Sequence, residues 1–475
     1  MTEIKINLEE KHNISPYLYM QFMEPLGTAD SSVDCAWDFI KNDWKPALIE
    51  KVKELQPKMV RFGGCFASYY RWKEAVGPFK SRTAMINYCW DGIYNNQVGT
   101  KELVDFCRRT DSKPLIVVNM ESDGRMHWAY PENGEDRFGT AEEAAEWIDY
   151  CNNPENKLRI SHGDIEPFKV KYWQIGNETS YDKRGYNSDK GVEVTKKFAE
   201  KMLQADNTVK LIAWGDEGSG DDTWCRKMSK IDNIDYLAFH HHFDSGLKNS
   251  PLRGTDYRID PENTWLHLMN AYKSLENHIE KMRADRGNKR LVMTEGHYAL
   301  PGRNRCEVLS TWGAGVSYAR CLNVIMRNSD IIDIATMADF FGNVWQVNAI
   351  LMTQRCEKAY FQPVATVMSL FSHHQGEKYL DIDYSGNIDC TASKTENKVY
   401  LHIANTSFTE NEEIKLDFGG REIEDIKLYG VSENILTEIT PVNMEVFDIK
   451  EFPTEKNCFI LPKAAVAAAE ITLKP

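Results

Sequence analysis

The feature that constrains the fold most is a repeated alternation of short β-rich segments with amphipathic stretches. Eight apolar or β-rich segments recur, at 16–22, 57–62, 114–120, 170–176, 209–214, 234–240, 290–295 and 331–338. Stretches with apolar residues at helical spacing lie between them, at 44–55, 101–109, 141–151 and 192–203. Near-continuous apolar strands that alternate with helices indicate an α/β protein whose parallel sheet is covered on its outer face. Eight such units predict a closed (β/α)8 TIM barrel, with a doubly wound open sheet as the alternative.

The pattern changes after about residue 376. Short strands are predicted at 398–405, 412–418, 424–430 and 464–473. Asn, Gly, Pro and charged turns separate them, which is typical of a small antiparallel β-sandwich. Residues 3–8 alternate in the same way. The predicted domains are therefore an N-terminal strand in 1–15 that joins the β-sandwich, a catalytic barrel at 16–375 and a C-terminal β-sandwich at 376–475.

The composition argues against several classes of partner. The 475-residue chain has a net charge of −14 and no basic stripe, whereas nucleic-acid binding depends on clustered Lys and Arg. No apolar run approaches the roughly 18 residues needed to cross a bilayer, so no membrane span is expected. The N-terminal residues lack the pattern of a secretory signal, and the 11 cysteines show no CxxC spacing. We therefore predict a cytoplasmic protein.

A parallel barrel carries its functional groups at the C-terminal ends of its strands. The polar residues there are Glu24, Arg61, Asn119, Glu121, Asn177, Glu178, Asp216, Glu217, His240, His241, Glu295 and Asp339. Glu178 and Glu295 come directly off β-rich segments on opposite sides of the predicted barrel. Cleavage of a glycosidic bond requires one carboxyl group that protonates the leaving oxygen and a second carboxylate that attacks carbon or activates water. These two glutamates are the predicted catalytic residues.

The gap between the two carboxyl groups decides the stereochemistry of such a reaction. A gap of about 5–5.5 Å gives a covalent intermediate and retention, and about 6.5–9.5 Å leaves room for a water and gives inversion. We expect the anion of Glu295 to raise the pKa of Glu178, so that Glu178 is neutral when substrate binds.

Other side chains allow both a functional and a structural interpretation. Six tryptophans lie in or near loops and strand ends: Trp72, Trp90, Trp128, Trp173, Trp214 and Trp345. Their faces can stack on a sugar, or they can simply fill the core. In the run 240–242, alternation along a strand allows only His240 and His242 to face one site. No metal and no cofactor are predicted, and Cys35, Cys65 and Cys89 are interpreted as packing residues.

The chain resembles glycoside hydrolase family 51, whose best-known members are retaining α-L-arabinofuranosidases with a (β/α)8 barrel and a C-terminal β-sandwich. The resemblance rests on YWQIGNE (172–178), VMTEG (292–296) and the segments 14–27, 60–78 and 89–107. It implies that Glu178 is the acid/base, that Asn177 binds the sugar's 2-hydroxyl and that Glu295 is the nucleophile. It further implies that Glu24 contacts the substrate, that Arg61 belongs to a conserved Arg-aromatic loop and that Trp90 covers the sugar pocket.

The chain departs from the family pattern at four places. The loop 60–78 lacks a Pro, Gln97 stands where Glu is usual, His241 replaces a Tyr and Asp339 replaces a Gln that touches the sugar. Neither catalytic glutamate is affected, so the departures bear on the substrate rather than on the reaction.

The predicted function is a retaining exo-acting α-L-arabinofuranosidase for short arabinose-containing oligosaccharides. The predicted substrate-binding residues are Glu24, Arg61, Trp90, Asn177, His240 and Asp339. A retaining β-xylosidase or endo-glucanase on the same scaffold is the enzymatic alternative, and a catalytically silent glycan-binding protein is the alternative outside enzymes. The resemblance also implies a homo-oligomer.

Overall fold

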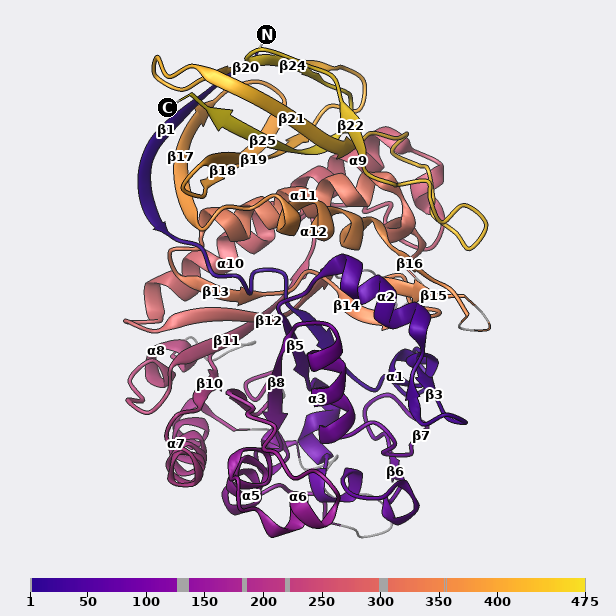
Figure 1. Cartoon of the computed structure of the whole chain (residues 1–475), viewed down its shortest axis with the longest axis vertical. Helices are drawn as coiled ribbons and strands as arrows, with labels where there is room; N and C mark the ends of the chain where they lie inside the picture. The colour runs from indigo at the N-terminus through magenta and orange to yellow at the C-terminus, as the bar shows by residue number, and fades with distance from the viewer. Residues whose placement is uncertain are drawn as a thin grey trace.

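The structure of the chain is a computed structural model that describes residues 2–125, 136–181, 186–217, 223–298, 306–353, 355 and 357–474. Figure 1 shows a β-sheet domain, which holds both chain termini, at one end of the molecule and an α/β barrel at the other. Helices α11 (Trp312–Arg327) and α12 (Pro363–His373) lie between the two. Among the described residues, no helix combines the length and the apolarity needed to span a bilayer.

The barrel sheet has the strand order β13-β12-β11-β10-β9-β8-β5-β2-β14-β15-β16. Its bounds are β2 (Gln21–Met23), β5 (Met59–Phe62), β8 (Lys113–Val118), β9 (Tyr172–Ile175), β10 (Lys210–Trp214), β11 (Tyr236–Phe243), β12 (Arg290–Tyr298), β13 (Ile332–Ala335), β14 (Asp339–Gly342), β15 (Asn348–Met352) and β16 (Ala359–Phe361). Every neighbouring pair from β13 to β15 is parallel, and only β16 runs antiparallel. A parallel bridge between Tyr17 and Ile334 closes the ring, and Met20 N donates to Ala335 O at 2.8 Å. The predicted TIM barrel is thus confirmed.

Helices cover the outside of the barrel and begin where the sequence provides a start signal. They include α2 (Pro46–Leu55), α3 (Thr100–Arg109), α5 (Ala141–Asn152), α7 (Ser188–Ala205), α8 (Trp224–Met228), α9 (Pro261–Asn270) and α10 (Tyr272–Asp285). Pro46 occupies the first turn of α2, and the side chains of Thr140 and Asn187 cap α5 and α7. The four predicted helical stretches all fall on these helices.

The eighth strand differs from the prediction of a single segment at 331–338. β13 ends at Ala335, the chain bends at 336–338, and β14 begins at Asp339 beside Phe22 of β2. Thr336 N still donates to Met293 O at 3.2 Å, so the bend redirects the chain across the barrel mouth rather than away from it. Asp339 therefore starts a strand instead of following one.

The C-terminal sheet has ten strands in the order β22-β21-β25-β19-β18-β17-β1-β20-β24-β23. Its bounds are β1 (Thr2–Asn13), β17 (Lys378–Tyr384), β18 (Ile388–Lys394), β19 (Lys398–Asn405), β20 (Glu412–Asp417), β21 (Ile423–Val431), β22 (Lys450–Phe452), β23 (Thr454–Glu455), β24 (Cys458–Leu461) and β25 (Val466–Leu473). β1 runs antiparallel to β17 and parallel to β20, which brings the N-terminal strand into the middle of the sheet. The residue boundaries assigned to the domains stay predictions.

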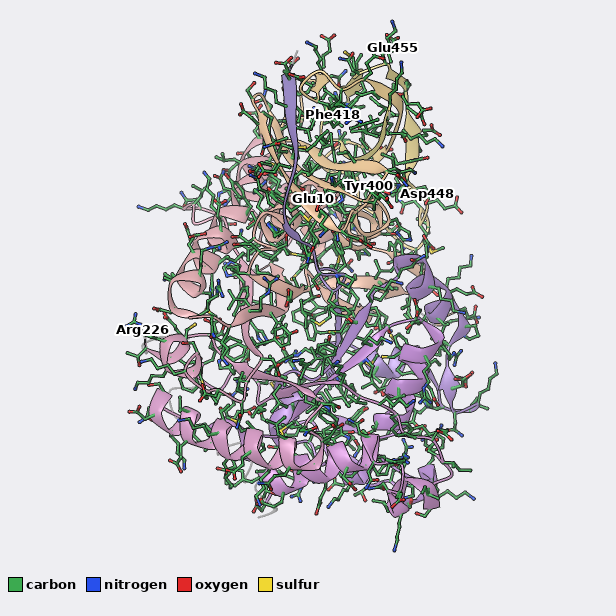
Figure 2. All side chains as sticks on the ribbon, turned by 60° about the vertical axis from the view of Figure 1, so that its left-hand side comes forward. Glu10, Arg226, Tyr400, Phe418, Asp448 and Glu455 are labelled. Carbon is green, nitrogen blue, oxygen red and sulfur yellow. The ribbon has the colours of Figure 1, made fainter. Side chains whose placement is uncertain are left out.

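One apolar core holds residues from both halves of this sheet, among them Ile4, Leu401, Ile414 and Leu428. The sheet must therefore fold over on itself, as the sandwich prediction requires. Phe418 lies in this core, whereas Glu10 and Glu455 are exposed on the outside of the same domain (Figure 2).

A buried ionic cluster joins the sheet to the barrel helices. Asp389 of β18 lies 3.2 Å from Nε of Arg320 and 2.9 Å from Nη1 of Arg327, and both arginines belong to α11. Asn323 Nδ2, on the same helix, donates to Asp389 Oδ1 at 3.0 Å. The Asp389 side chain is only 5% exposed, so the carboxylate depends on these partners for its stability.

Candidate active site

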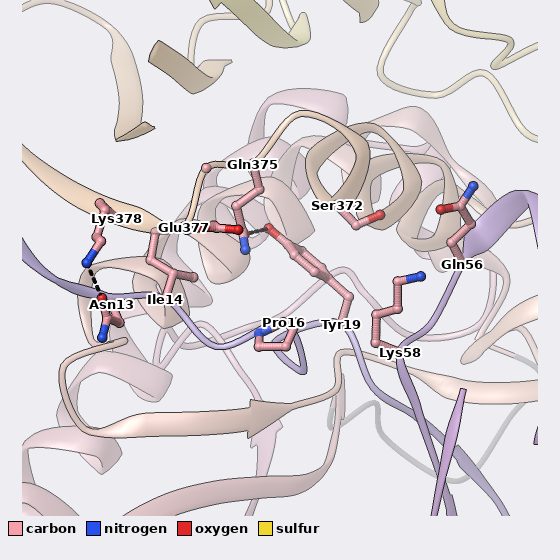
Figure 3. A pocket seen from close by; sticks show the side chains of 11 residues that line it. Asn13, Ile14, Pro16, Tyr19, Gln56, Lys58, Ser372, Gln375, Glu377 and Lys378 are labelled. Carbon is pink, nitrogen blue, oxygen red and sulfur yellow. Dashed lines mark hydrogen bonds between the residues drawn. The ribbon is translucent and has the colours of Figure 1, made fainter. Parts of the chain in front are cut away.

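A cavity of about 370 Å³ opens at the C-terminal ends of the barrel strands. It is lined by Phe22, Glu24, Leu26, Cys65, Trp90, Glu178, Tyr181, His242, Glu295, His297, Tyr298, Cys306, Asp339 and Trp345. A larger cavity of about 530 Å³ lies near the amino-terminal ends of β2 and β5 (Figure 3). Glu377 is the one carboxylate among the residues that line that second cavity, so it lacks the pair that glycoside cleavage needs. The chemistry belongs to the smaller cavity.

The two predicted catalytic glutamates meet in this cavity although 117 positions separate them in the sequence. A carboxylate oxygen of Glu178 and one of Glu295 lie within 4.8 Å of each other. His240 Nδ1 lies between them, 3.0 Å from Glu178 Oε1 and 3.5 Å from Glu295 Oε2. A gap this short falls on the side of retaining enzymes and is too small for an interposed catalytic water.

Arg61, at the end of β5, fixes the position of Glu295. Its guanidinium is fully buried and donates from Nη1 to Glu295 Oε1 at 2.8 Å. The other two nitrogens donate to Asn177 Oδ1 at 2.6 Å and to Gln174 Oε1 at 3.0 Å. The planar guanidinium therefore binds three side chains at once and fixes their relative positions.

The electrostatics of Glu178 differ from the expectation. Burial raises the pKa of Glu178, but the hydrogen bond and charge of His240 and the charge of Arg125 outweigh it and lower that pKa below its ordinary value. The predicted rise is therefore wrong for the unliganded site, because the closest neighbours of Glu178 are cationic groups rather than Glu295. His240 Nε2 lies 3.0 Å from Thr294 Oγ1, which orients the ring toward the carboxylate.

Two further carboxyl groups, those of Glu24 and Asp339, face the cavity, and their pKa values are raised where that of Glu178 is lowered. Burial, together with the charge of Glu295, raises the pKa of Glu24 and that of Asp339 well above their ordinary values. Glu24 Oε1 accepts hydrogen bonds from Phe66 N and Trp90 Nε1, both at 3.0 Å. Asp339 Oδ1 is buried without a hydrogen-bond partner among the described groups. Burial therefore favours the protonated form of both acids.

The predicted binding residues form two layers. Glu24, Trp90 and Asp339 lie on the cavity wall, whereas Arg61, Asn177 and His240 lie behind it and hold the carboxylates. The Asn177 Nδ2 atom is buried and has no hydrogen-bond partner among the described groups. The substrate-binding roles of all six stay predictions.

The tryptophans separate into cavity and core residues. Trp90 and Trp345 line the cavity with ring centroids 6.1 Å apart. Trp72, Trp173 and Trp214 are buried away from the cavity wall. The predicted Trp128 lies outside the described residues.

Asp30 holds the loop that presents Trp345. Its carboxylate accepts hydrogen bonds from the backbone nitrogens of Asn343, Val344 and Trp345 at 3.0–3.2 Å, and one from Asn348 Nδ2 at 2.5 Å.

Several residues near the catalytic pair were missed by the sequence analysis. Cys65, interpreted there as a packing residue, donates from Sγ to Glu178 Oε2 at 3.5 Å. Arg125 approaches the same oxygen at 3.5 Å, and Tyr181 and His297 line the cavity. His297 follows the predicted strand 290–295 as closely as Glu178 follows 170–176, so its position gave a signal that was not used. Arg125 and Tyr181 lie farther from a predicted strand end, and their position gave none.

The remaining strand-end residues turn away from the cavity. His241 contacts Ser274 and His278 of α10, as alternation along β11 predicts, while His242 lines the cavity. Glu121 bonds Lys197, and Glu217 is absent from the cavity wall.

Glu178, His240 and Glu295 also form the one group of described residues whose ligand atoms lie close enough together for a metal ion. Arg61 and Arg125 already lie within 3.5 Å of the two carboxylates. A divalent cation would face these two buried positive charges, so the donor set fits an ion-pair network rather than a metal centre.

Sequence comparisons identify the same family over most of the chain. Residues 51–250 match the family description "Alpha-L-arabinofuranosidase 1 domain", and residues 296–456 match "Alpha-L-arabinofuranosidase C-terminal domain". An "Intracellular exo-alpha-(1->5)-L-arabinofuranosidase 1" of Bacillus subtilis is 23% identical over 84% of this chain and 78% of its own length. An "Alpha-L-arabinofuranosidase C" of Emericella nidulans is 30% identical, over 43% of this chain and 40% of its own.

Solved structures share the complete fold. The GH51 arabinofuranosidase of Xanthomonas axonopodis pv. citri superposes with a TM-score of 0.83 at 18% identity, over 99% of both chains. The α-L-arabinofuranosidase of Thermotoga maritima superposes with a TM-score of 0.78 at 22% identity, over 100% of both. On the two domain matches, the chain belongs to the α-L-arabinofuranosidases of glycoside hydrolase family 51.

Proposed function

We propose that this glycoside hydrolase is a retaining, exo-acting α-L-arabinofuranosidase, with Glu295 as the nucleophile and Glu178 as the acid/base. The observation that carries the proposal is the approach of the two carboxylates within 4.8 Å inside one cavity. That gap suits direct attack on the anomeric carbon. Arg61 supports the ionised state that a nucleophile requires.

In the first step, a carboxylate oxygen of Glu295 bonds to the anomeric carbon as the glycosidic bond breaks. The electron pair of that bond passes to the leaving oxygen, which takes a proton from Glu178. In the second step, Glu178 removes a proton from water, the water oxygen attacks the same carbon, and Glu295 is released.

The contact between Glu178 and His240 affects the charge of the acid/base. His240 Nδ1 lies 3.0 Å from Glu178 Oε1, and this hydrogen bond lowers the pKa of Glu178 in the open site. A bound sugar removes water from the cavity and disfavours the ionised form of a buried carboxyl group. We expect Glu178 to be protonated once the substrate is bound, so that the leaving oxygen can take its proton.

Carboxyl groups with a raised pKa and an amide suit recognition of sugar hydroxyls. In its protonated form each of Asp339 and Glu24 offers one donor, and the Nδ2 atom of Asn177 has no hydrogen-bond partner among the described groups. The resemblance assigns the 2-hydroxyl to Asn177. Trp90 and Trp345 supply apolar faces beside these polar groups.

Exo action on short oligosaccharides inside the cell is the finer part of the proposal. The relatives from Bacillus subtilis, Acetivibrio thermocellus and Halalkalibacterium halodurans are named intracellular exo-α-(1→5)-L-arabinofuranosidases.

A homo-oligomer is part of the same proposal, and size-exclusion chromatography with light scattering tests it.

The decisive experiment compares variants on aryl α-L-arabinofuranosides. Glu295→Ala should abolish turnover, and Glu178→Gln should slow substrates with poor leaving groups by about 10²–10⁴-fold while sparing activated ones. Glu217→Gln, a rim glutamate outside the cavity wall, is the matched control. Unchanged turnover by the Glu295 variant contradicts the proposal.

Two further assays test the substrate and the stereochemistry. Aryl β-xylosides and β-glucosides should be hydrolysed far more slowly than the arabinofuranoside. Proton NMR of the first product should show the anomer of the substrate.

A further inference from the structure

The segment after β8 adopts an unusual left-handed turn, η4 (Glu121–Gly124). Its φ angles are +48° at Glu121, +58° at Ser122, +51° at Asp123 and +73° at Gly124. A left-handed conformation costs about 1–2 kcal/mol for each residue that is not glycine, and it normally occurs as isolated residues. Three such residues in succession persist only where the surrounding structure imposes them.

Buried hydrogen bonds impose this conformation. Asn119 Oδ1 accepts from Ser122 N at 2.9 Å, and Met120 O accepts from Asp123 N at 2.7 Å. The hydroxyl of Ser68 donates to the Asp123 carboxylate. Ser122 and Asp123 are both fully buried, so the turn is part of the packed barrel and not a surface loop.

The turn delivers two charged groups to the backbone beneath the acid/base. The carboxylate of Asp123 lies against the backbone at Gly176, directly before Asn177 and Glu178. Arg125 Nη2 donates to Asn177 O at 3.0 Å and to Glu178 O at 2.9 Å, and it lies 3.5 Å from Glu178 Oε2. Gly176 is required here, because an added Cβ would lie 2.7 Å from Asp123 Oδ1.

Glu178 itself is in the left-handed region, at φ +50°. Its backbone therefore needs external restraint to keep the carboxyl group directed at the cavity. Arg125 supplies that restraint, since it bonds the carbonyls on both sides of the strained residue. Its guanidinium is 3% exposed and is absent from the cavity wall, so it acts through Glu178 and not on the sugar.

We propose that the left-handed turn at 121–124 and Arg125 form a rigid mount for the acid/base, with Arg125 as a positioning residue for proton transfer. The inference rests on the proposed role of Glu178. A displacement of about 1 Å in a catalytic group can reduce the rate by 10²-fold. A fixed position of the Glu178 carboxyl group can therefore outweigh the conformational strain of the turn. A merely structural Arg125 would affect all substrates equally.

The first test is Arg125→Met, which keeps the length and removes the bonds and the charge. We expect kcat/KM on an arabino-oligosaccharide to fall about 10–100-fold, less than the full contribution of general acid catalysis because Glu178 is displaced and not removed. The dinitrophenyl arabinofuranoside should lose less than about threefold. Arg125→Lys should recover part of the loss, because it restores the charge and one donor. Equal losses on both substrates, or no recovery with Lys, overturn the proposal.

The second test addresses the turn itself through Ser122. Ser122→Gly removes the conformational strain, and it should leave both rates unchanged and the free energy of unfolding undiminished. Ser122→Val introduces a β-branched residue that resists a positive φ. Like Arg125→Met, it should lower the rate on the arabino-oligosaccharide much more than the rate on the dinitrophenyl arabinofuranoside, a difference called here the leaving-group split. If Gly and Val behave alike, the left-handed turn does not position the acid.

Glu178→Gln separates failure of this inference from failure of the proposed function. If that variant shows the leaving-group split and neither Arg125→Met nor Ser122→Val does, the mount alone is refuted. If Glu178→Gln slows both substrates equally, both the assignment of Glu178 as the acid and the proposed mount are refuted. Should Arg125→Met fail to fold, Arg125→Lys and the two Ser122 variants decide the question.

Discussion

Removal of the Arg61 guanidinium should disable the nucleophile without blocking the cavity. Arg61→Met keeps the volume of the side chain but leaves the Glu295 carboxylate, which is 9% exposed, without the cation now 2.8 Å away. Breaking a buried ion pair by removing one partner costs about 3–5 kcal/mol. If that cost falls on ionised Glu295, kcat/KM decreases roughly 10²–10⁴-fold.

A second variant makes this prediction specific. Arg61→Lys retains a charge but replaces three directed bonds with a point charge, so its loss should be smaller than that of Met.

The assay is hydrolysis of 4-nitrophenyl α-L-arabinofuranoside between pH 4 and pH 9, with urea unfolding as a check on folding. A folded Arg61→Met enzyme whose kcat/KM lies within about threefold of the parent would refute the reasoning, since less than 1 kcal/mol would then depend on this ion pair.

Two further predictions concern stability. Asp389→Ala should lower the free energy of unfolding by about 3–5 kcal/mol, because it leaves the partly buried Arg320 and Arg327 unpaired, and urea denaturation measures the loss. A change below about 1 kcal/mol would show that the cluster contributes little to the barrel–sheet junction. Burial raises the pKa of Asp123 to about 6, so the folded protein holds a proton that the unfolded chain releases at lower pH. Stability should therefore fall by roughly 3 kcal/mol from this group as pH rises from about 4 to 6, and Asp123→Asn should abolish that dependence in unfolding curves recorded across the window.

The sequence was sufficient to predict the barrel and the meeting of Glu178 and Glu295 at its mouth, because both depend on local patterns. Apolar periodicity located the strands, and Glu178 and Glu295 follow or continue apolar runs that the barrel brings together. The break in the eighth strand was missed, since 331–338 is apolar apart from Asp333 and Thr336 and only the contact of Asp339 with β2 reveals the bend.

The contacts that tune the site depend on tertiary structure and leave no local pattern. Arg125 follows a turn whose positive φ angles occur at Glu121, Ser122, Asp123 and Gly124. Only the last two are residue types that commonly adopt this conformation. The low pKa of Glu178 arises from His240, which lies 62 positions away. Spacing along the chain contains no information on that approach.

The charges of the site explain why Asp339 can stand where the family pattern has Gln. Glu295 is paired with Arg61, and Glu178 with Arg125 and His240, whereas no described cation forms an ion pair with Glu24 or Asp339. Burial and the charge of Glu295 raise the pKa of both unpaired acids, which favours their protonated forms. A protonated carboxyl group presents one O–H donor and a carbonyl acceptor, whereas an amide presents two N–H donors and a carbonyl acceptor. A protonated Asp339 would therefore keep a donor and an acceptor at the position where the family pattern has Gln.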